Sequence, residues 1–202
     1  MKTASARSSG KMSETSIQAV SEPSWQTRYP GFVRATWLLL LAFALHELEE
    51  WNILAYYQAH FPDGPPMSVT NVRVTLVAMV LIYWLGVYAA MRTRSARRAG
   101  FIILLLAATL FLNALEHIYF AARWREYGPG LVTAVTLLLP ASSLVAWRAW
   151  RDGLVPLPFI VALAMFVVLT SGVWAIHPEA NVTRKHLAAD RIGGALVRLL
   201  VP

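Results

Sequence analysis

The chain has 202 residues, 57% of them hydrophobic, and its mean hydropathy is +0.50. Several apolar runs reach the roughly 20 residues that cross a hydrocarbon core, so the lipid bilayer is the expected partner. The net charge is +7, but the basic residues stand between the apolar runs, which excludes nucleic acid as an expected partner. The absence of cysteine excludes disulfides, thiolate metal sites and cysteine nucleophiles.

The apolar runs predict an all-α fold, a polytopic transmembrane helical bundle of about five spans. We expect a disordered cytoplasmic tail over residues 1–30, a helical membrane domain over 31–177, and a basic, amphipathic tail over 178–202. In that last tail, Gly193 and Gly194 argue against a helix that runs throughout. The predicted spans cover approximately residues 32–57, 69–91, 100–122, 129–147 and 157–177.

The distribution of lysine and arginine predicts how the bundle is oriented. Segment 92–98, between the second and third spans, contains four arginines. Short arginine-rich connections stay in the cytoplasm, which places this segment and the N-terminus on the cytoplasmic side. A fifth span then puts the C-terminus on the outer side.

A histidine and three glutamates interrupt the first apolar run, within Ala44-Leu-His-Glu-Leu-Glu-Glu-Trp51. A charged side chain near the bilayer centre costs about 2.5–3.5 kcal/mol on insertion scales, so ionisable residues at this depth indicate a functional site. His46, Glu49 and Glu50 stand at i, i+3 and i+4 and therefore share one helix face. Glu47 points about 100° away from His46 and is left outside that face.

The third apolar run repeats this spacing with Asn113, Glu116 and His117. The first and third spans are expected to run in the same direction. Counted from the cytoplasmic arginine that precedes each run, Glu50 and Asn113 stand at nearly the same position, so the two polar faces lie at the same depth. The spacing predicts a single site in the outer half of the membrane, built from two parallel helices.

Imidazoles and carboxylates without thiolates suit zinc or iron. We predict a mononuclear metal site held by His46, Glu50 and His117, with Glu49 as a fourth ligand or as a base. The residues assigned to catalysis are Glu49, Asn113 and Glu116. The zinc-protease motif does not apply, because position 50 is Glu where that motif has its second His. A di-iron centre built from the same histidines and glutamates stays open.

Two metal-free interpretations use the same residues. Burial and crowding of like charges would keep one carboxyl group protonated beside an imidazole, a pair suited to acid–base catalysis or to a proton relay. The polar groups could also hold helices together or stabilise a partner, although such interhelical hydrogen bonds contribute only about 0.6 kcal/mol each. We therefore expect a metal-dependent enzyme acting on a lipid or lipophilic small molecule. The alternatives are a small proton-coupled transporter or binding protein and a structural protein, and the pattern sets no oligomeric state.

Several motifs occur together in an order that is similar to a known family. They are His46-Glu-Leu-Glu-Glu50, Asn113-x-x-x-His117, and Tyr127-Gly-Pro-Gly130 with Thr133 and Pro140. They resemble the motifs of the HXXEE family of predicted integral membrane proteins, over about residues 35–150. The resemblance implies a largely bacterial family with catalytic polar motif residues and no assigned reaction, and hence a protein of the bacterial inner membrane.

Overall fold

The structure, a computed structural model, describes residues 24–62, 66–176 and 178–200. Within these ranges the chain forms helices and no strand, which confirms the predicted all-α helical bundle. Four helical stretches are long and apolar enough, by length and composition, to cross a membrane, as expected of an integral membrane protein. They are Pro30–His60, Val69–Arg92, Ala96–Trp124 and Leu131–Arg151, and a shorter apolar stretch, Leu157–Val173, follows them.

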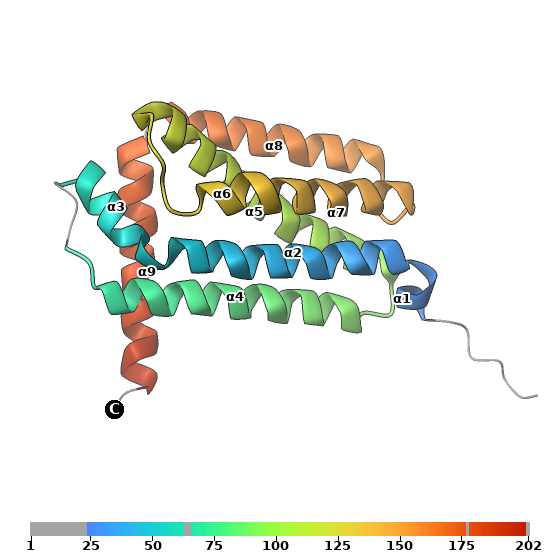
Figure 1. Cartoon of the computed structure of the whole chain (residues 1–202). Coiled ribbons are helices and arrows are strands. Elements are labelled where there is room, and N and C mark those ends of the chain that lie inside the picture. The colour runs from blue at the N-terminus through green and yellow to red at the C-terminus, as the bar shows by residue number, and fades with distance from the viewer. Residues whose placement is uncertain (1–23, 63–65, 177, 201–202) are drawn as a thin grey trace, which may run out of the picture.

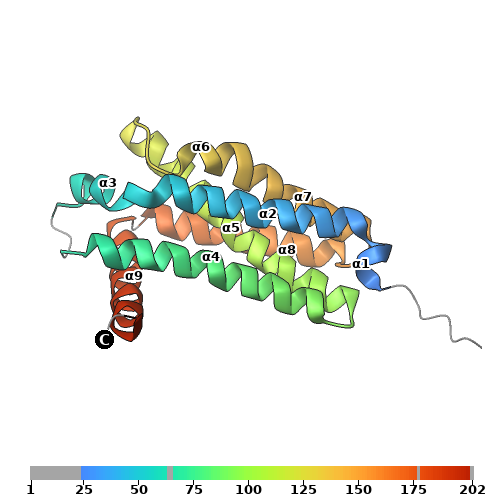
Figure 2. The same ribbon diagram turned by 60° about the horizontal axis from the view of Figure 1, so that its bottom comes forward.

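The elements in chain order are α1 (Trp25–Arg28), α2 (Pro30–Glu49), η1 (Glu50–Asn52), α3 (Ile53–His60), α4 (Val69–Arg92), α5 (Ala96–Trp124), α6 (Leu131–Thr133), η2 (Ala134–Leu138), α7 (Leu139–Arg151), α8 (Leu157–Ile176) and α9 (Pro178–Leu200). Helices α2, α4, α5, α7 and α8 lie lengthwise in one bundle, while α9 crosses the end of the bundle that carries α3 (Figures 1 and 2). Each predicted span coincides with a helical stretch. That α8 crosses the membrane stays a prediction.

Most of the predicted N-terminal tail, residues 1–23, lies outside the described part of the chain. Its last residues, 24–30, are ordered, because α1 packs against the connection between α4 and α5. Trp25 is buried there, and its indole Nε1 donates a hydrogen bond to the Thr93 carbonyl at 2.8 Å. Over residues 24–30 the prediction of disorder is therefore wrong.

The core of the bundle consists of apolar side chains from α2, α4, α5 and α7, which become almost fully buried when these helices pack. Phe32, Phe43 and Ile103 have at most 1% of their surface exposed. Large apolar residues also cover the outside, and Leu48 and Leu85 are about two-thirds exposed. Such a surface would be costly in water but is as apolar as the lipid chains of a bilayer. The bundle is thus apolar inside and outside, and its buried polar residues stand out.

The first membrane helix changes pitch beside those polar residues. Helix α2 ends at Glu49, a 3-10 turn follows over Glu50–Asn52, and α3 then continues as an α-helix. Arg73 of α4 donates from Nε to the Trp51 carbonyl at 3.2 Å and from Nη2 to the Asn52 side chain at 2.7 Å. A cation is favourable at the carbonyl end of a helix, so Arg73 stabilises the break.

The fourth long helix is continuous from α6 through α7 but contains a π-helical turn, η2. Pro140 follows this turn and has no backbone N–H to donate to the preceding residues. A π turn is one way in which a helix absorbs such a missing bond. Thr133 is the last residue before the turn, so the irregular backbone is confined to the region next to it.

Helix α9 continues through Gly193 and Gly194, so the expected interruption there is wrong. The glycines permit a close contact with α4, because a Cβ atom on Gly193 would lie 2.6 Å from the backbone carbonyl carbon of Asn71. Asp190 secures the crossing by accepting hydrogen bonds from Ser68 N and Asn71 Nδ2, both at 3.0 Å. Tertiary packing therefore outweighs the low helix propensity of glycine.

Candidate functional site

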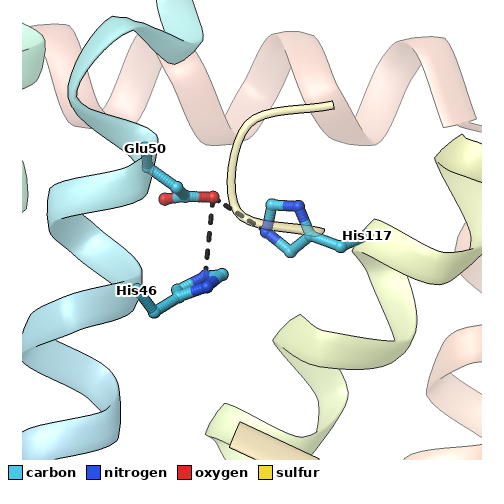
Figure 3. A group of neighbouring side chains, drawn as sticks. All are labelled: His46, Glu50 and His117. Carbon is cyan, nitrogen blue, oxygen red and sulfur yellow. Dashed lines mark ion pairs between the residues drawn. The ribbon is translucent and has the colours of Figure 1, made fainter. Parts of the chain in front are cut away.

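Three predicted ligand residues meet inside the bundle. His46 comes from α2, Glu50 from the 3-10 turn that follows it, and His117 from α5, and each has at most 8% of its surface exposed. Glu50 Oε1 lies 2.8 Å from His117 Nε2 and 3.6 Å from His46 Nε2, as the dashed lines in Figure 3 show. One potential ligand atom from each residue lies within 4.8 Å of the others. The first and third long helices therefore bring these three residues together, as the spacing of their polar residues predicts.

Hydrogen bonds at the His46 ring nitrogen that points away from Glu50 and His117 define the tautomer of His46. The Thr133 hydroxyl lies 2.5 Å from Glu49 Oε2 and 2.9 Å from His46 Nδ1. A carboxylate only accepts, so the single hydroxyl proton is donated to Glu49 and the Thr133 oxygen accepts from Nδ1–H of His46. The other ring nitrogen, Nε2, then carries a lone pair. It points into the cluster, towards Glu50 and His117.

Glu49 binds the start of the fourth long helix and is not a member of the group of three. Its carboxylate accepts hydrogen bonds from Tyr127 Oη at 2.7 Å, Val132 N at 3.2 Å and Thr133 N at 2.8 Å. Backbone N–H groups at a helix start are favourable partners for an anion. Glu49, predicted as a fourth ligand or a base, therefore orients His46 through Thr133.

Tyr127 is the exposed end of this hydrogen-bonded chain, with 56% of its surface accessible. Its hydrogen bond to Glu49 raises the pKa of the Tyr127 phenol to about 12, because ionisation would remove the donated proton and place two negative charges side by side. At neutral pH the phenol therefore stays a hydrogen-bond donor to Glu49.

The backbone of Gly130 packs directly against the three side chains of the site. Gly130 has a φ of 91°, a conformation that L side chains rarely adopt. A Cβ atom on Gly130 would lie 2.6 Å from His117 Cε1, 2.9 Å from His46 Cε1 and 3.0 Å from Glu50 Cγ. The loop before α6 therefore lies directly on all three side chains, and only a residue without a side chain fits there.

The remaining polar residues lie beside the cluster rather than in it. Asn113 and Glu116, both assigned to catalysis from the sequence, line a neighbouring cavity of about 590 Å³. Glu47, which the helix geometry made a doubtful member of the site, lines the same cavity and is 7% exposed. The helix phase gives the angle between Glu47 and His46, but it does not show that a cavity lies on the Glu47 side of α2.

The donor set fits a divalent metal ion. Two imidazoles and a carboxylate are a common protein ligand set for zinc and for non-haem iron, both of which keep open positions in catalytic sites. His46 Nε2 is a buried atom that makes no hydrogen bond within the described residues, as expected of an atom kept available for a cation. The Glu49–Thr133–His46 chain is the kind of outer contact that orients a ligating histidine.

Comparison with known proteins identifies the family to which these residues belong. Residues 37–145, more than half of the chain, match the family model described as "Protein of unknown function with HXXEE motif". No curated protein and no solved structure matches the chain. The matched segment contains the three cluster residues, Glu49 and the loop with Gly130.

Proposed function

The chain belongs to the HXXEE family, whose function is unknown, and from its site we propose that it is a metal-dependent membrane enzyme acting on a lipid or lipophilic small molecule. The observation that carries the proposal is the buried group of His46, Glu50 and His117. Ionisable groups at this depth are costly unless they pair or bind a cation. A group of three with one histidine nitrogen left without a hydrogen bond is better explained by a cation than by helix packing alone.

In this proposal His46, Glu50 and His117 hold zinc or iron. A metal ion held in this way supplies a Lewis acid or lowers the pKa of a bound water. Glu49 and Thr133 fix the orientation and tautomer of His46, and Gly130 keeps bulk water from the cluster. Asn113 and Glu116 face the adjacent cavity, where Asn113 would hold the polar end of a substrate and Glu116 would exchange a proton with it.

We further propose that this site lies in the outer half of a bacterial inner membrane, with the N-terminus in the cytoplasm. The arginines between α4 and α5 support this orientation, because they mark one end of the bundle as cytoplasmic. The cluster lies towards the opposite end, where α3 and the loop before α6 are found (Figure 1).

A second function, a proton-coupled transporter or binding protein, is favoured by one observation. The hydrogen-bonded chain Tyr127–Glu49–Thr133–His46 leads from an exposed phenol to a fully buried imidazole. Such a chain has the connectivity that a proton relay needs. A relay predicts that proton movement depends on Thr133 in metal-free protein, whereas the metal enzyme predicts bound metal.

Elemental analysis of the full-length chain, purified in detergent and incubated with zinc or iron before desalting, tests the primary proposal. We expect about one metal ion per chain in the wild type and strong loss of metal in the His46→Ala, Glu50→Gln and His117→Ala variants. His60→Ala is the matched control, since His60 Nε2 also contacts a glutamate, Glu126 at 2.7 Å, but belongs to no group of three among the described residues. Metal-free wild type, or equal metal in all variants, would overturn the proposal.

A further inference from the structure

A large cavity lies next to the candidate metal site. It has a volume of about 590 Å³, within the range of small-molecule sites in proteins. Its wall includes Phe43 of α2, Met79 of α4, Leu112 of α5 and Ala175 of α8, so it lies between four helices of the bundle. Most of the lining is apolar, and such a wall suits an alkyl chain or a fused ring system.

The cavity is connected to the metal site by sequence neighbours. Glu47 directly follows His46, Glu116 directly precedes His117, and both glutamates line the cavity. Asn113 lines it as well, one helical turn before His117. The end of the cavity that carries Glu47, Asn113 and Glu116 therefore borders the cluster, while the remainder extends into apolar surroundings.

The polar end of the cavity favours hydrogen-bond donors. Its ionisable side chains, Glu47 and Glu116, are both carboxyl groups, and none of the described residues that line it is Lys, Arg or His. The Asn113 carbonyl oxygen is a buried acceptor that makes no hydrogen bond of ordinary geometry within the described residues. Acceptors and negative charge attract hydroxyl and amine groups, and they repel carboxylates and phosphates.

We propose that this cavity binds a lipophilic molecule with a hydrogen-bond-donating head, a hydroxyl or an amine, and discriminates against lipids with a carboxylate or phosphate head. The apolar tail lies against α4 and α8, and the head lies at Glu47, Asn113 and Glu116, beside the cluster. This assignment rests on the proposed function only in making that molecule the substrate of the same site.

Three photoreactive probes with the same twelve-carbon chain test the preference: an amine, an alcohol and a carboxylate, each with a diazirine in the chain. The full-length chain is labelled in detergent at neutral pH after treatment with EDTA, and labelled peptides are mapped by mass spectrometry. We expect the amine and the alcohol to label cavity residues at least about tenfold more than the carboxylate. Equal labelling by all three probes, or labelling confined to the outside of the bundle, would overturn the proposal.

Two substitutions in α8 test whether the probes bind in the cavity. Gly172 lines the cavity, and a Cβ atom there would meet no atom within 4 Å, so Gly172→Leu fills the space without a clash in the backbone. It should lower labelling by the amine about tenfold. Val173→Leu on the exposed face is the matched control and should leave labelling unchanged, since Val173 is 59% exposed. Unchanged labelling of Gly172→Leu would contradict the assignment.

A charge-removing variant separates the two possible heads. In Glu47→Gln/Glu116→Gln, labelling by the amine should fall to the level of the alcohol, because the carboxylates that favour a cation are gone. An amine preference that survives this change would overturn the role given to the two glutamates.

The labelling experiment needs no metal, so it fails independently of the proposed function. Selective labelling of a chain that binds no metal would refute the metal enzyme and support the cavity assignment. One metal per chain together with unselective labelling would support the metal enzyme and refute the cavity assignment.

Discussion

Thr133 Oγ1 lies 2.9 Å from His46 Nδ1 and joins two helices at positions 87 residues apart in the sequence. Because the same hydroxyl donates to Glu49, it holds the His46 ring in the tautomer with an available Nε2. Replacing Thr133 with Val removes this contact and retains the shape. We expect metal affinity to fall about 10–100-fold, as when other outer contacts of ligating histidines are removed. Competition with a chromophoric chelator measures the change, and Thr133→Ser should retain wild-type affinity.

Glu49 should matter for stability as well as for orientation, because its carboxylate accepts four hydrogen bonds from the first turn of the fourth long helix and the loop before it. We expect Glu49→Gln to lower the free energy of unfolding by about 1–2 kcal/mol. Reversible unfolding in mixed micelles gives this value. Glu126→Gln is the control, since Glu126 pairs with His60 at an exposed position and surface pairs contribute little. Equal losses in both variants would contradict the anchoring role.

The contact between Gly130 and the cluster can be tested by substituting two glycines that both have positive φ angles. Gly130 has φ 91° and Gly153 has φ 67°, so Ala at either position should cost about 1–2 kcal/mol of stability. A new Cβ on Gly130 meets His117 and His46, whereas one on Gly153 meets nothing within 4 Å. Gly130→Ala should therefore lose bound metal and Gly153→Ala should keep it. Metal analysis alongside thermal unfolding separates strain from the clash.

The Tyr127 phenol should titrate at unusually high pH. Its pKa is raised from 10.0 to about 12 by the hydrogen bond to Glu49. A raised pKa means that the folded chain holds this proton more tightly, so the stabilisation is fully present below pH 10 and is lost as the pH rises towards 12. Phenolate absorbance of wild type minus Tyr127→Phe gives the midpoint. Glu49→Gln should return the Tyr127 pKa towards 10, and an ordinary midpoint in the wild type would refute the contact.

The crossing of α9 over α4 depends on the absence of a side chain at Gly193. Gly193→Ala would bring its Cβ into the backbone of Asn71, so we expect α9 to detach and become a site of limited proteolysis. Gly194→Ala is the matched control, because the nearest atom to its Cβ is the flexible amide Nδ2 of Asn71 at 3.2 Å. Protease resistance of both variants would show that the close contact is unnecessary.

Helical periodicity was sufficient to predict the cluster but not its surroundings. His46, Glu50 and His117 could be brought together from the sequence because the α-helix repeat and the membrane fix both phase and depth. Gly130 ends a loop whose path follows no period, and the same loop sets the position of Thr133 in α6. Their contacts with His46 and His117 could therefore not be derived. A doublet of glycines around a proline before a helix is the only local signal that a special backbone conformation occurs there.

Glu47 shows a second limit of such reasoning. A helical wheel gives the angle between Glu47 and His46, but which face meets a cavity depends on how α4, α5 and α8 pack around α2. The continuous α9 illustrates the same dependence, because Gly193 is a helix breaker in isolation and a contact point when Asn71 lies against it.

The loop that carries Gly130 also has a kinetic consequence. It lies on the two histidines, and its neighbour Tyr127 is held by a hydrogen bond to Glu49. We expect a cation that enters past this loop to wait for that bond to open, so that the frequency of loop opening sets the exchange rate. Tyr127→Phe should then shorten the residence time of a bound ion far more than it changes the equilibrium constant for metal binding. In that case the exposed phenol controls how fast an ion enters and leaves the buried site.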